Sequence, residues 1–339
     1  MLGIVIVSYN TSQLTLACLR SVACAQADQA LRVVLVDNGS DALQQQALRE
    51  GVAGHTLREL EHVQAQTNTG FAAASNRAIE ILLDDARIRR ILMLNNDAEL
   101  VDGGLSALLA HADECPDADM IGAGMYRFDA PDEVDSLGIA MYASALGSNR
   151  KERGDRLLGP TGGLALYSRK MLEVLRARHG MIFDERFFCY AEDTDVALRA
   201  RLLGFDTAFL DQCVALHHGQ ASSGGGFSDF VLYHGIRNSI WTMVKNFPLP
   251  WLIGLSPLIV ALHCAIVLRH GLGGRFRLVW RLYRDACKGL PAMWRSRQVI
   301  QRTRVLSLRG FGRLLTPRFY DRAYLRQAWR ELWGGRRNV

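Results

Sequence analysis

A short acidic cluster is the first feature of this 339-residue sequence with evident chemical capacity. Glu192, Asp193 and Asp195 lie directly before an apolar helical pattern that ends at Gly204. Carboxylates so closely spaced repel one another, which raises the pKa of one of them and suits it to take a proton from an attacking hydroxyl group. Acidic side chains are also favoured in the first turn of a helix, so a helix-capping role is the alternative.

Polar segments interrupt the first hundred residues, each directly after a short, mostly apolar run. These segments are Ser8-Tyr9-Asn10, Asp37-Asn38-Gly39, Asn68-Thr69-Gly70-Phe71 and Asn95-Asn96-Asp97. Each alone is typical of a turn, because Asn, Asp and Gly are common turn residues. Four of them at the ends of neighbouring strands would share one edge of a sheet, where a ligand can bind.

Alternating strands and helices are needed to bring those segments together. Almost uninterrupted apolar runs predict strands covered on both faces, as in a parallel sheet. The expected strands are Ile4–Ser8, Leu31–Val36, His62–Ala65 and Ile91–Leu94. The expected helices are Leu14–Val22, Asp41–Arg49, Phe71–Leu83 and one that begins near Leu164–Tyr167. This order predicts an α/β fold whose ligands bind beyond the carboxyl ends of the strands.

Composition and the absence of certain motifs limit the classes of protein to which the sequence can belong. With 49% hydrophobic and 22% charged residues, the chain is a globular protein with a sizeable core. Its seven cysteines are scattered without a Cys-x-x-Cys pair, which predicts a reducing cytosol and neither a disulfide framework nor a cysteine-built zinc site. The first residues run directly into an expected strand, so we expect no secretory signal. Neither a G-x-G-x-x-G fingerprint nor a P-loop is present.

Charge divides the sequence into two unlike parts. Residues 1–268 hold 22 Lys and Arg against 31 Asp and Glu, whereas residues 269–339 hold 18 against 3. All six tryptophans lie after residue 240. We therefore expect a boundary near residue 246, between a first region of residues 1–246 and a basic, Trp-rich helical region of residues 247–339.

The basic region admits three interpretations: a nucleic-acid-binding surface, a surface for anionic lipid, or a solvated helical face. The segment Leu249–Leu268 before it lacks Asp, Glu, Lys and Arg and is long enough to span a bilayer. Pro250, Gly254 and Pro257 weaken a simple spanning helix. A single span from a cytosolic first region would also place the basic region outside, against the positive-inside tendency. We therefore expect a shallow or re-entrant membrane anchor, with amphipathic helices that carry interfacial Trp and Arg.

Six motifs in a fixed order make the sequence recognisable. They are IVIVSYN, VVLVDNGS, NTGFAAASNRA, LMLNNDAEL, FDERFFCYAEDTDVALRARLLGF and LHHG. Over about residues 2–246 they resemble the family 2 glycosyltransferases, and most of all the bacterial rhamnosyltransferase-like enzymes. The resemblance implies a GT-A fold, that is, a Rossmann-like, mostly parallel sheet with flanking helices. It also implies transfer of a sugar from a nucleotide-diphosphate donor.

A divalent cation is implied as well, because Mg²⁺ or Mn²⁺ neutralises a leaving diphosphate. The family typically has Asp-x-Asp after the fourth strand, and this sequence has Asn95-Asn96-Asp97. The resemblance makes Asp97 a metal ligand and places Asn95 at the nucleotide. His217 is the expected second ligand, with His218 as the alternative, although a histidine in such a place is also typical of a hydrogen-bonded structural residue.

The donor nucleotide needs contacts to its base and ribose together with backbone donors for its phosphates. The resemblance assigns these contacts to Ser8, Tyr9, Asn10, Asp37, Asn38, Asn68, Gly70, Phe71, Asn76, Arg77, Asn95 and Asn96. The helix that begins near Phe71 presents free backbone N–H groups, which favour bound negative charge. Arg77 either pairs with the diphosphate or only covers the surface of that helix.

On the acceptor side, the resemblance singles out Asp193 as the general base of a direct, inverting displacement. Glu192 and Asp195 then hold it in position or contact the acceptor. The expected donor is dTDP-rhamnose and the expected acceptor is a polyprenyl-diphosphate-linked saccharide. The reaction would take place at the cytoplasmic face of the inner membrane, in cell-surface polysaccharide biosynthesis.

Three loops are expected around the acceptor. Gly162 and Gly163 either border the acceptor or form a turn. The segment Phe183–Phe188 leads into the helix of the base, with its aromatic side chains packed beneath that helix. The segment Ser222–Gly226 is either a lid that orders over bound donor or an ordinary linker.

Two other functions compete with this interpretation. An inactive relative could serve as a scaffold in a polysaccharide-assembly complex, which the amide at Asn95 favours and the intact Glu192–Asp195 cluster opposes. A nucleic-acid-binding protein would be led by its basic region and would bind in a strongly salt-dependent manner. We expect no nucleic-acid partner.

Overall fold

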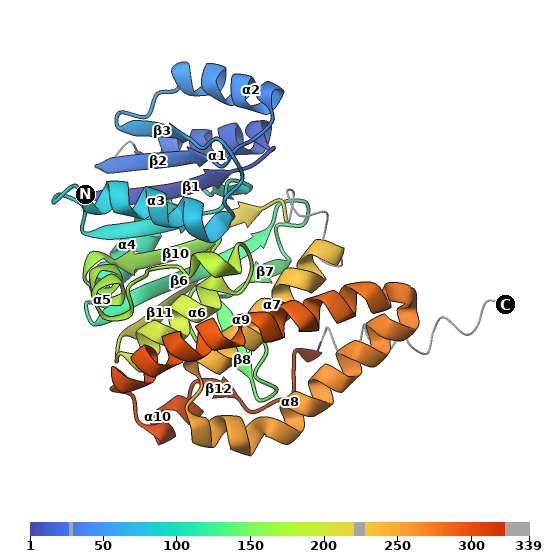
Figure 1. Cartoon of the computed structure of the whole chain (residues 1–339). Helices are drawn as coiled ribbons and strands as arrows, with labels where there is room; N and C mark the ends of the chain where they lie inside the picture. Colours follow the sequence, from blue (N-terminus) through green and yellow to red (C-terminus); the bar gives the residue numbers. More distant parts are fainter. Residues whose placement is uncertain (27–29, 220–227, 323–339) are drawn as a thin grey trace.

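The computed structural model describes residues 1–26, 30–219 and 228–322. Helices lie on both faces of one long, curved sheet, and a smaller sheet and further helices complete the molecule (Figure 1). The strand order in the long sheet is β3-β2-β1-β4-β10-β6-β11-β5, with β7 paired to β6. The α/β architecture expected from the alternating apolar pattern is therefore confirmed.

The first four strands of the long sheet are the four expected from the sequence, of which β1, β2 and β4 are apolar runs and β3 is more polar and more exposed. They are β1 (Leu2–Ser8), β2 (Leu31–Asp37), β3 (Leu60–Gln64) and β4 (Arg90–Leu94). β1 pairs in parallel with both β2 and β4, and β2 pairs in parallel with β3. Every residue of β1 is buried, as expected of a strand with both faces covered. The four predicted strands differ from the observed ones only at their ends.

The remaining strands of this sheet run in both directions. They are β5 (Ala98–Leu100), β6 (Ala118–Arg127), β7 (Val134–Ser136), β10 (Leu164–Ser168) and β11 (Asp206–His217). β11 is parallel to β6, whereas β10 is antiparallel to both of its neighbours, β4 and β6. The sheet is thus mixed at its centre and parallel towards the β3 edge.

The helix predicted to begin near Leu164–Tyr167 is wrong. These residues form β10, because all four are buried between the two helical layers and their backbone pairs with β4 and β6. The helix α5 (Arg169–His179) begins only after Ser168, whose Oγ accepts a hydrogen bond from the Met171 backbone N–H. A short apolar run is compatible with a strand or a buried helix, and the capping serine marks the change.

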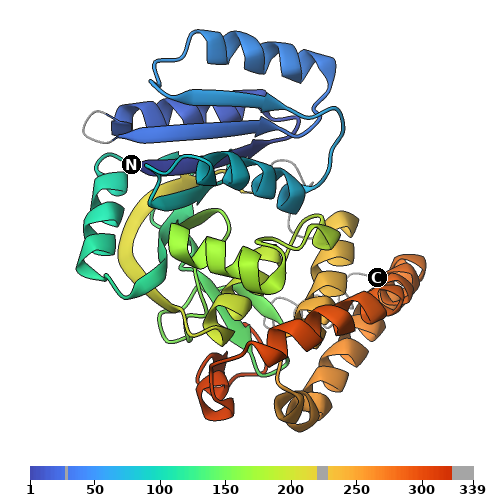
Figure 2. The same ribbon diagram turned by 60° about the vertical axis from the view of Figure 1, so that its left-hand side comes forward.

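Two layers of helices cover the long sheet (Figure 2). One face carries α1 (Ser12–Ala25), α2 (Ala42–Ala53) and α4 (Gly104–Glu114), whose apolar side chains join one core. The other face carries α3 (Phe71–Leu83), α5 and α6 (Glu192–Leu202), whose side chains join a second core. The predicted helix Phe71–Leu83 is confirmed at both ends.

The smaller sheet connects the middle of the chain to its last described segment. It has the order β12-β8-β9, formed by β8 (Ile139–Tyr142), β9 (Gly147–Asn149) and β12 (Leu315–Thr316). The parallel pairing of β12 with β8 fixes residues 315–316 beside the segment that precedes β10.

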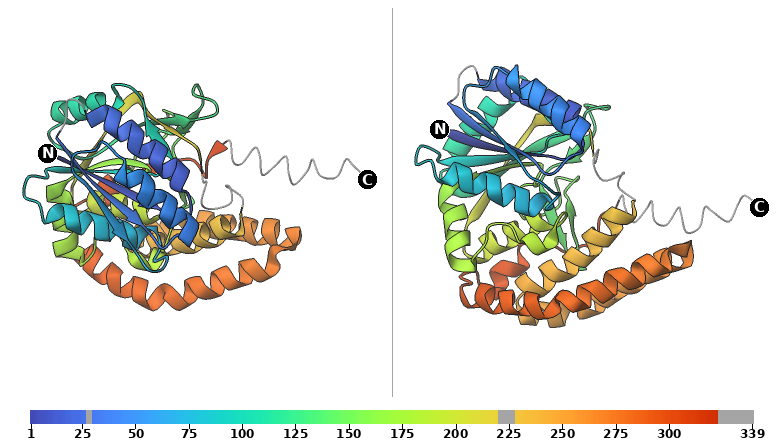
Figure 3. Two further views of the ribbon diagram at one scale, coloured as in Figure 1. Left: turned by 90° about the horizontal axis from the view of Figure 1, so that it is seen from above. Right: turned by 45° about the horizontal axis from the view of Figure 1, so that its top comes forward.

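The last helices lie against the α6 side of the molecule. They are α7 (Asp229–Asn246), α8 (Leu249–His270), the π-helical turn η3 (Gly271–Arg275), α9 (Phe276–Arg302) and α10 (Leu308–Gly312). α8 and α9 form a hairpin joined by η3, and α9 packs on α7 (Figures 1 and 3). Arg297 of α9 donates hydrogen bonds to the carbonyls of Val244 and Phe247, at 2.8 and 2.6 Å. Contacts therefore cross residue 246, and the division into residues 1–246 and 247–339 stays a prediction.

The helix α8 is apolar, continuous and mostly exposed. It is 22 residues long with a mean hydropathy of 2.2, and 11% of its most apolar stretch is buried. Among the described residues it is the one helix long and apolar enough to cross a membrane. Pro250 lies in its first turn, where proline is tolerated, and the helix continues through Pro257. The expected weakening by these prolines does not interrupt it.

Candidate active site

The loops that follow β1 and β2 meet at one edge of the sheet. The Asn38 backbone N–H donates to the carbonyl of Ser8 at 2.8 Å, and the Asn10 N–H donates to Oγ of Ser40 at 2.9 Å. The side chain of Asn10 accepts a hydrogen bond from the Asp41 N–H at 2.8 Å. These contacts bring Ser8–Asn10 and Asp37–Asn38 together, as predicted from their places at strand ends.

Asp37 has the strongest sign of a missing ligand in this part of the site. Its side chain is completely buried at the end of β2. Oδ1 accepts a hydrogen bond from the Ser40 N–H at 3.1 Å, whereas the buried Oδ2 has no hydrogen-bond partner among the described residues. A buried carboxylate oxygen without a donor is costly, so a donor from a ligand is expected there.

The third loop is tied to the second by side-chain amides. Asn38 donates to Oδ1 of Asn68 at 3.0 Å and accepts a hydrogen bond from the Thr69 N–H at 3.1 Å. Gly70 follows with a φ of 87°, and a Cβ atom there would lie 2.6 Å from Phe188. Only glycine fits at position 70, which is the N-cap directly before α3. Asn38 and Asn68 therefore shape the loop with their own amide groups.

Asn76 and Asn96, two of the residues predicted to bind the donor, use their side-chain amides within the protein. Both ends of the Asn76 amide contact the chain near Phe183: Nδ2 donates to its carbonyl and Oδ1 accepts from its N–H, each at 2.9 Å. Asn96 donates to the hydroxyls of Thr11 and Thr15 on the α1 side. Both amides thus hold protein segments together. Arg77 is exposed on α3, with no hydrogen bond or ion pair to other described residues.

A carboxylate and a histidine that lie 120 residues apart in the sequence form the candidate metal centre. Nε2 of His217 lies 3.0 Å from Oδ1 of Asp97, and Nδ1 lies 2.8 Å from Oδ2 of Asp135. β11 carries His217, and its antiparallel pairing with β5 places that residue opposite Ala98. Burial opposes a charged imidazole, but Asp135 and Asp97 raise the pKa of His217 to about 10.

The donor set suits Mn²⁺ or Mg²⁺ with part of the coordination sphere supplied by the substrate. Carboxylate oxygen is a preferred ligand of both ions, His217 would add one imidazole nitrogen, and Asp135 would orient that imidazole from behind, as carboxylates do at many metal sites. No group of three metal-ligating side chains is present among the described residues. A nucleotide diphosphate and water would have to complete the coordination, as is common for Mg²⁺.

His218 does not share this centre. Its Nε2 lies 2.9 Å from Oε1 of Glu99, and its ring stacks on Phe128 with the centroids 3.8 Å apart. Of the two histidines weighed from the sequence, His217 is the one beside Asp97.

The predicted base lies at the start of α6 beside the glycine pair. Oδ2 of Asp193 accepts a hydrogen bond from the Gly162 N–H at 2.9 Å, and Oδ1 accepts one from the Thr194 N–H at 2.6 Å. A Cβ atom at position 162 would lie 3.2 Å from Cβ of Asp193, so glycine allows this close approach. Burial raises the pKa of Asp193, and the two N–H groups partly offset that rise.

One path of direct contacts joins the metal candidates to the base. The Asn95 N–H donates to the carbonyl of Gly163 at 3.0 Å, and Nδ2 of Asn95 lies 3.5 Å from Nε2 of His217. Gly163 follows Gly162, which holds Asp193. The glycine pair thus lies between Asp97 and Asp193, at the antiparallel entry to β10. A chain of contacts therefore links the two aspartates through the glycine pair.

The acidic cluster contains three carboxyl groups in three different environments. Burial, followed by the charge of Asp193, raises the pKa of Glu192 to about 8, and its buried Oε2 has no hydrogen-bond partner among the described residues. Burial alone would raise the pKa of Asp195 too, but Lys245 and Arg199 reverse the effect and lower it. The repulsion predicted from the sequence therefore raises the pKa of Glu192, whereas burial alone raises that of Asp193 and the nearby cations lower that of Asp195.

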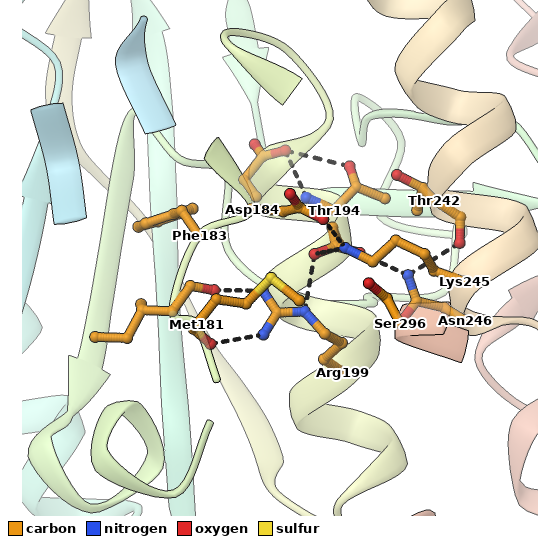
Figure 4. A network of polar contacts seen from close by, with 12 residues as sticks. Met181, Phe183, Asp184, Thr194, Arg199, Thr242, Lys245, Asn246 and Ser296 are labelled. Atoms are coloured by element: carbon orange, nitrogen blue, oxygen red, sulfur yellow. Dashed lines mark hydrogen bonds and ion pairs between the residues drawn. The ribbon is translucent and has the colours of Figure 1, made fainter. Parts of the chain in front are cut away.

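A buried ionic network anchors the helix of the base (Figure 4). Nζ of Lys245 lies 2.5 Å from Oδ2 of Asp184 and 3.0 Å from Oδ1 of Asp195. Arg199 donates to Asp195 at 2.8 Å, and Asn246 donates to it at the same distance. Asp195 is completely buried, so of its two predicted roles the network supports the positional one.

Several of these residues escaped the sequence analysis. Asp135, Lys245 and Asn246 lie in segments without a recognisable motif. Asp184 lies inside the FDERFF motif but was given no role there, and only the structure shows the partners of these residues. Lys245-Asn246 is a polar pair at the end of an otherwise apolar helical stretch, a signal that could have been noticed. Phe183 is buried in the core that α6 joins, as predicted, whereas Phe187 is buried against Trp241 of α7 and Met293 of α9. The segment Ser222–Gly226, predicted as a lid or linker, lies outside the described residues.

Comparisons with known proteins identify the family of the chain. Residues 3–176 match the sequence profile described as "Glycosyl transferase family 2". A curated relative, the N-acetylglucosaminyl-diphospho-decaprenol L-rhamnosyltransferase of Mycobacterium tuberculosis, is 27% identical over 252 residues, which cover 66% of this chain and 78% of the relative.

Solved structures share the fold at low sequence identity. One is the mannosyltransferase PcManGT from Pyrobaculum calidifontis in complex with GDP-Man and Mn²⁺, with a TM-score of 0.52 at 16% identity. The superposed region covers 98% of this chain and 87% of the PcManGT chain. TarS 1–349 of S. aureus in complex with UDP has a TM-score of 0.51 at 16% identity, with coverages of 92% and 91%. The profile match spans more than half of the sequence. The chain therefore belongs to glycosyl transferase family 2 and is a glycosyltransferase with the GT-A fold.

Proposed function

We propose that this glycosyltransferase moves L-rhamnose from dTDP-rhamnose to a polyprenyl-diphosphate-linked saccharide, with inversion at the anomeric carbon. The observation that carries this proposal is the path of contacts from Asp97 to Asp193, which links the proposed cation ligands to the proposed base through the glycine pair. The name of the M. tuberculosis relative supports the choice of sugar and of a lipid-linked acceptor.

The donor nucleotide lies on the loops after β1, β2 and β3. The unpaired Oδ2 of Asp37 accepts a hydrogen bond from the imide N–H of a thymine or uracil base, or from a ribose hydroxyl. Backbone N–H groups in the first turn of α3, beyond Gly70, favour the negative diphosphate. Asn38 and Asn68 keep this loop in shape.

The diphosphate end of the donor lies at Asp97 and His217. These two side chains would hold Mn²⁺ or Mg²⁺, which when bound stabilises the negative charge that develops on the leaving diphosphate. Asp135 fixes the orientation of His217 through Nδ1. Asn95, where the family typically has an aspartate, contacts His217 and leaves the site with one carboxylate at this position.

Asp193 takes the proton of the acceptor. As the acceptor oxygen attacks the anomeric carbon, its O–H proton passes to an oxygen of Asp193, and the bond from the anomeric carbon to the diphosphate oxygen breaks on the opposite face. The N–H groups of Gly162 and Thr194 orient the carboxylate, and the raised pKa improves it as a base. One displacement of this kind inverts the configuration and needs no covalent enzyme intermediate.

A membrane surface is the place of reaction in this proposal, on its cytoplasmic side. Exposed apolar side chains of α8 recur at Leu249, Ile253, Val260 and Val267, on one stripe of the helix. Near its start, a hollow of about 490 Å³ is lined in part by three arginines and Trp294. A surface that combines exposed aliphatic groups, tryptophan and arginine is typical of proteins bound to anionic lipid.

The proposal is tested with the purified full chain, Mn²⁺ or Mg²⁺, and a polyprenyl-diphosphate-linked N-acetylglucosamine acceptor. Nucleoside diphosphate release is measured for dTDP-rhamnose, UDP-N-acetylglucosamine and GDP-mannose, and NMR of the product gives the anomeric configuration. We expect acceptor-dependent release from dTDP-rhamnose with an inverted linkage. Release from another donor would correct the sugar, and no transfer from any donor would favour the scaffold interpretation.

The role of the base is tested with Asp193→Asn, which keeps the size of the side chain. We expect kcat to fall roughly 10²- to 10⁴-fold while nucleotide binding is retained. Asp206→Asn is the matched control, because Asp206 is exposed at the opposite end of β11 and pairs with Arg201. Near-normal turnover of Asp193→Asn would remove Asp193 as the base.

A further inference from the structure

The turn that leads into the base helix is held in an unfavourable backbone conformation. Phe188, Tyr190 and Ala191 have φ angles of 67°, 71° and 64°, a region that residues other than glycine rarely occupy. Phe188 has a ψ of −63°, and the Cys189 N–H donates to the carbonyl of Phe187 at 2.8 Å. This is a γ-turn of the rare, strained hand. Such a segment persists only where its surroundings impose it.

One buried side-chain amide on α7 meets most of the carbonyls in this turn. Nδ2 of Asn238 donates towards the carbonyls of Phe187, Cys189 and Tyr190, at 2.9, 2.8 and 2.7 Å. Asn238 is completely buried, so no water competes for these carbonyls on its side. Its contacts compensate for the backbone strain.

Arg237 fixes the direction of that amide. Its Nε donates to Oδ1 of Asn238 at 2.9 Å, so the Nδ2 hydrogens must face the turn. Its Nη2 also donates to the carbonyl of Phe187 at 3.0 Å. The guanidinium group is buried over the ring of Trp241, 4.4 Å from the centroid. The pair Arg237-Asn238 is thus a rigid unit aimed at the turn.

The turn contacts both halves of the active site. In the chain direction, Ala191 caps α6 in the left-handed conformation, and its carbonyl accepts the first helical hydrogen bond, from Asp195, at 2.9 Å. On the other side, the carbonyl of Phe188 accepts a hydrogen bond from the Ala72 N–H at 3.2 Å, and Phe188 leaves no room for a side chain at Gly70. The conformation of the turn therefore sets where the base helix starts relative to the donor loop.

We propose that Asn238 is a positioning residue of the transfer reaction: by holding the turn Phe188–Ala191, it places Asp193 relative to the donor loop at Gly70. The assignment rests on the proposed function, because Asn238 acts through Asp193. Without its amide, the carbonyls of Phe187, Cys189 and Tyr190 lose a donor and the turn relaxes towards negative φ. Asp193 then moves with the first turn of α6, and misplacement of a base lowers the rate of chemistry more than the affinity for nucleotide.

The test compares Asn238→Ala with the double variant Asn238→Ala/Ala191→Gly. We expect Asn238→Ala to lower kcat roughly 10- to 100-fold, with the affinity for free nucleoside diphosphate within about threefold of the wild type. Glycine adopts positive φ without steric strain, so the double variant should regain roughly tenfold in kcat. Ser239→Ala is the matched control, because Oγ of Ser239 bonds only to the Gly235 carbonyl of its own helix among the described residues.

Two outcomes would overturn the inference. One is wild-type kcat in a folded Asn238→Ala chain; the other is a loss of kcat that Ala191→Gly restores only in step with the melting temperature. If Asn238→Ala does not fold, Asn238→Ser, which keeps one donor, takes its place in the same comparison.

A second readout separates this inference from the proposed function. Hydrogen exchange of the Asp195 amide should quicken in Asn238→Ala and slow again when Ala191→Gly is added. A wild-type chain that transfers no sugar would refute the proposed function, and unchanged exchange at Asp195 would refute the role of Asn238 on its own.

Discussion

Replacement of Glu192 by glutamine isolates the effect of a buried acid on folding. Burial and Asp193 raise the pKa of Glu192 from 4.5 to about 8 in the folded chain. Between these two values the folded state keeps the proton while the unfolded chain has released it. Stability contributed by the neutral form is therefore complete below about pH 4.5 and declines as the pH rises towards 8. Glutamine is neutral at every pH and removes this decline.

The size of the effect follows from the difference between the two pKa values. Each pKa unit corresponds to about 1.4 kcal/mol, so the full interval gives an upper bound of roughly 5 kcal/mol in the free energy of unfolding. Coupling to Asp193 divides the shift between two groups, so we expect about 2–4 kcal/mol. Glu192→Gln should match the wild type near pH 5 and exceed its stability by that amount at pH 8.

Urea unfolding at several pH values between 5 and 8 measures the difference directly. Glu50→Gln serves as the control, because Glu50 is exposed on α2 and its variant should follow the wild type at every pH. A difference between Glu192→Gln and the wild type that does not change with pH would refute the reasoning. So would a difference that shrinks as the pH rises.

Three further perturbations address other parts of the molecule. Lys245→Met leaves the buried carboxylates Asp184 and Asp195 without the cation they share. Urea unfolding should then show a free energy of unfolding lower by about 3–5 kcal/mol. An unchanged unfolding midpoint would contradict the role of the network. Removal of divalent ions with EDTA should abolish turnover and added Mn²⁺ restore it, whereas Asp97→Ala should lose Mn²⁺-dependent nucleotide binding in calorimetry. Ile253→Asp should lower co-flotation with phosphatidylglycerol vesicles roughly tenfold or more, and Leu43→Asp, at a side chain that is 79% exposed on α2, should leave it unchanged.

The fold was predictable where the chain follows simple periodicities. The buried strands from Leu2 to Leu94 and the helix Phe71–Leu83 follow from apolar runs and helical spacing, and strand ends place the polar segments on one edge. Leu164–Tyr167 was predicted incorrectly because four consecutive apolar residues satisfy both a strand and a buried helix. Only the pairing of these residues with β4 and β6 shows that they form a strand.

The candidate site was likewise predictable from the sequence only in part. Asp97, His217, Gly162 and Asp193 stand in recognisable motifs, and the structure brings them within one set of contacts. Asn76 was assigned to the donor from its motif, yet its amide is saturated by the segment at Phe183, a partner more than a hundred residues away. Partners at such distances follow from tertiary packing, which local sequence does not encode.

The direction of β10 has a consequence for how such enzymes diversify. Because this strand runs opposite to β4 and β6, its beginning lies beside the end of β4, and the connection before it, residues 150–163, ends at the glycine pair that contacts Asn95 and Asp193. A strand running the other way would carry that connection to the far side of the sheet. Insertions and exchanges upstream of Gly162 can therefore remodel the acceptor side, while the loops that follow β1 to β3 stay as they are.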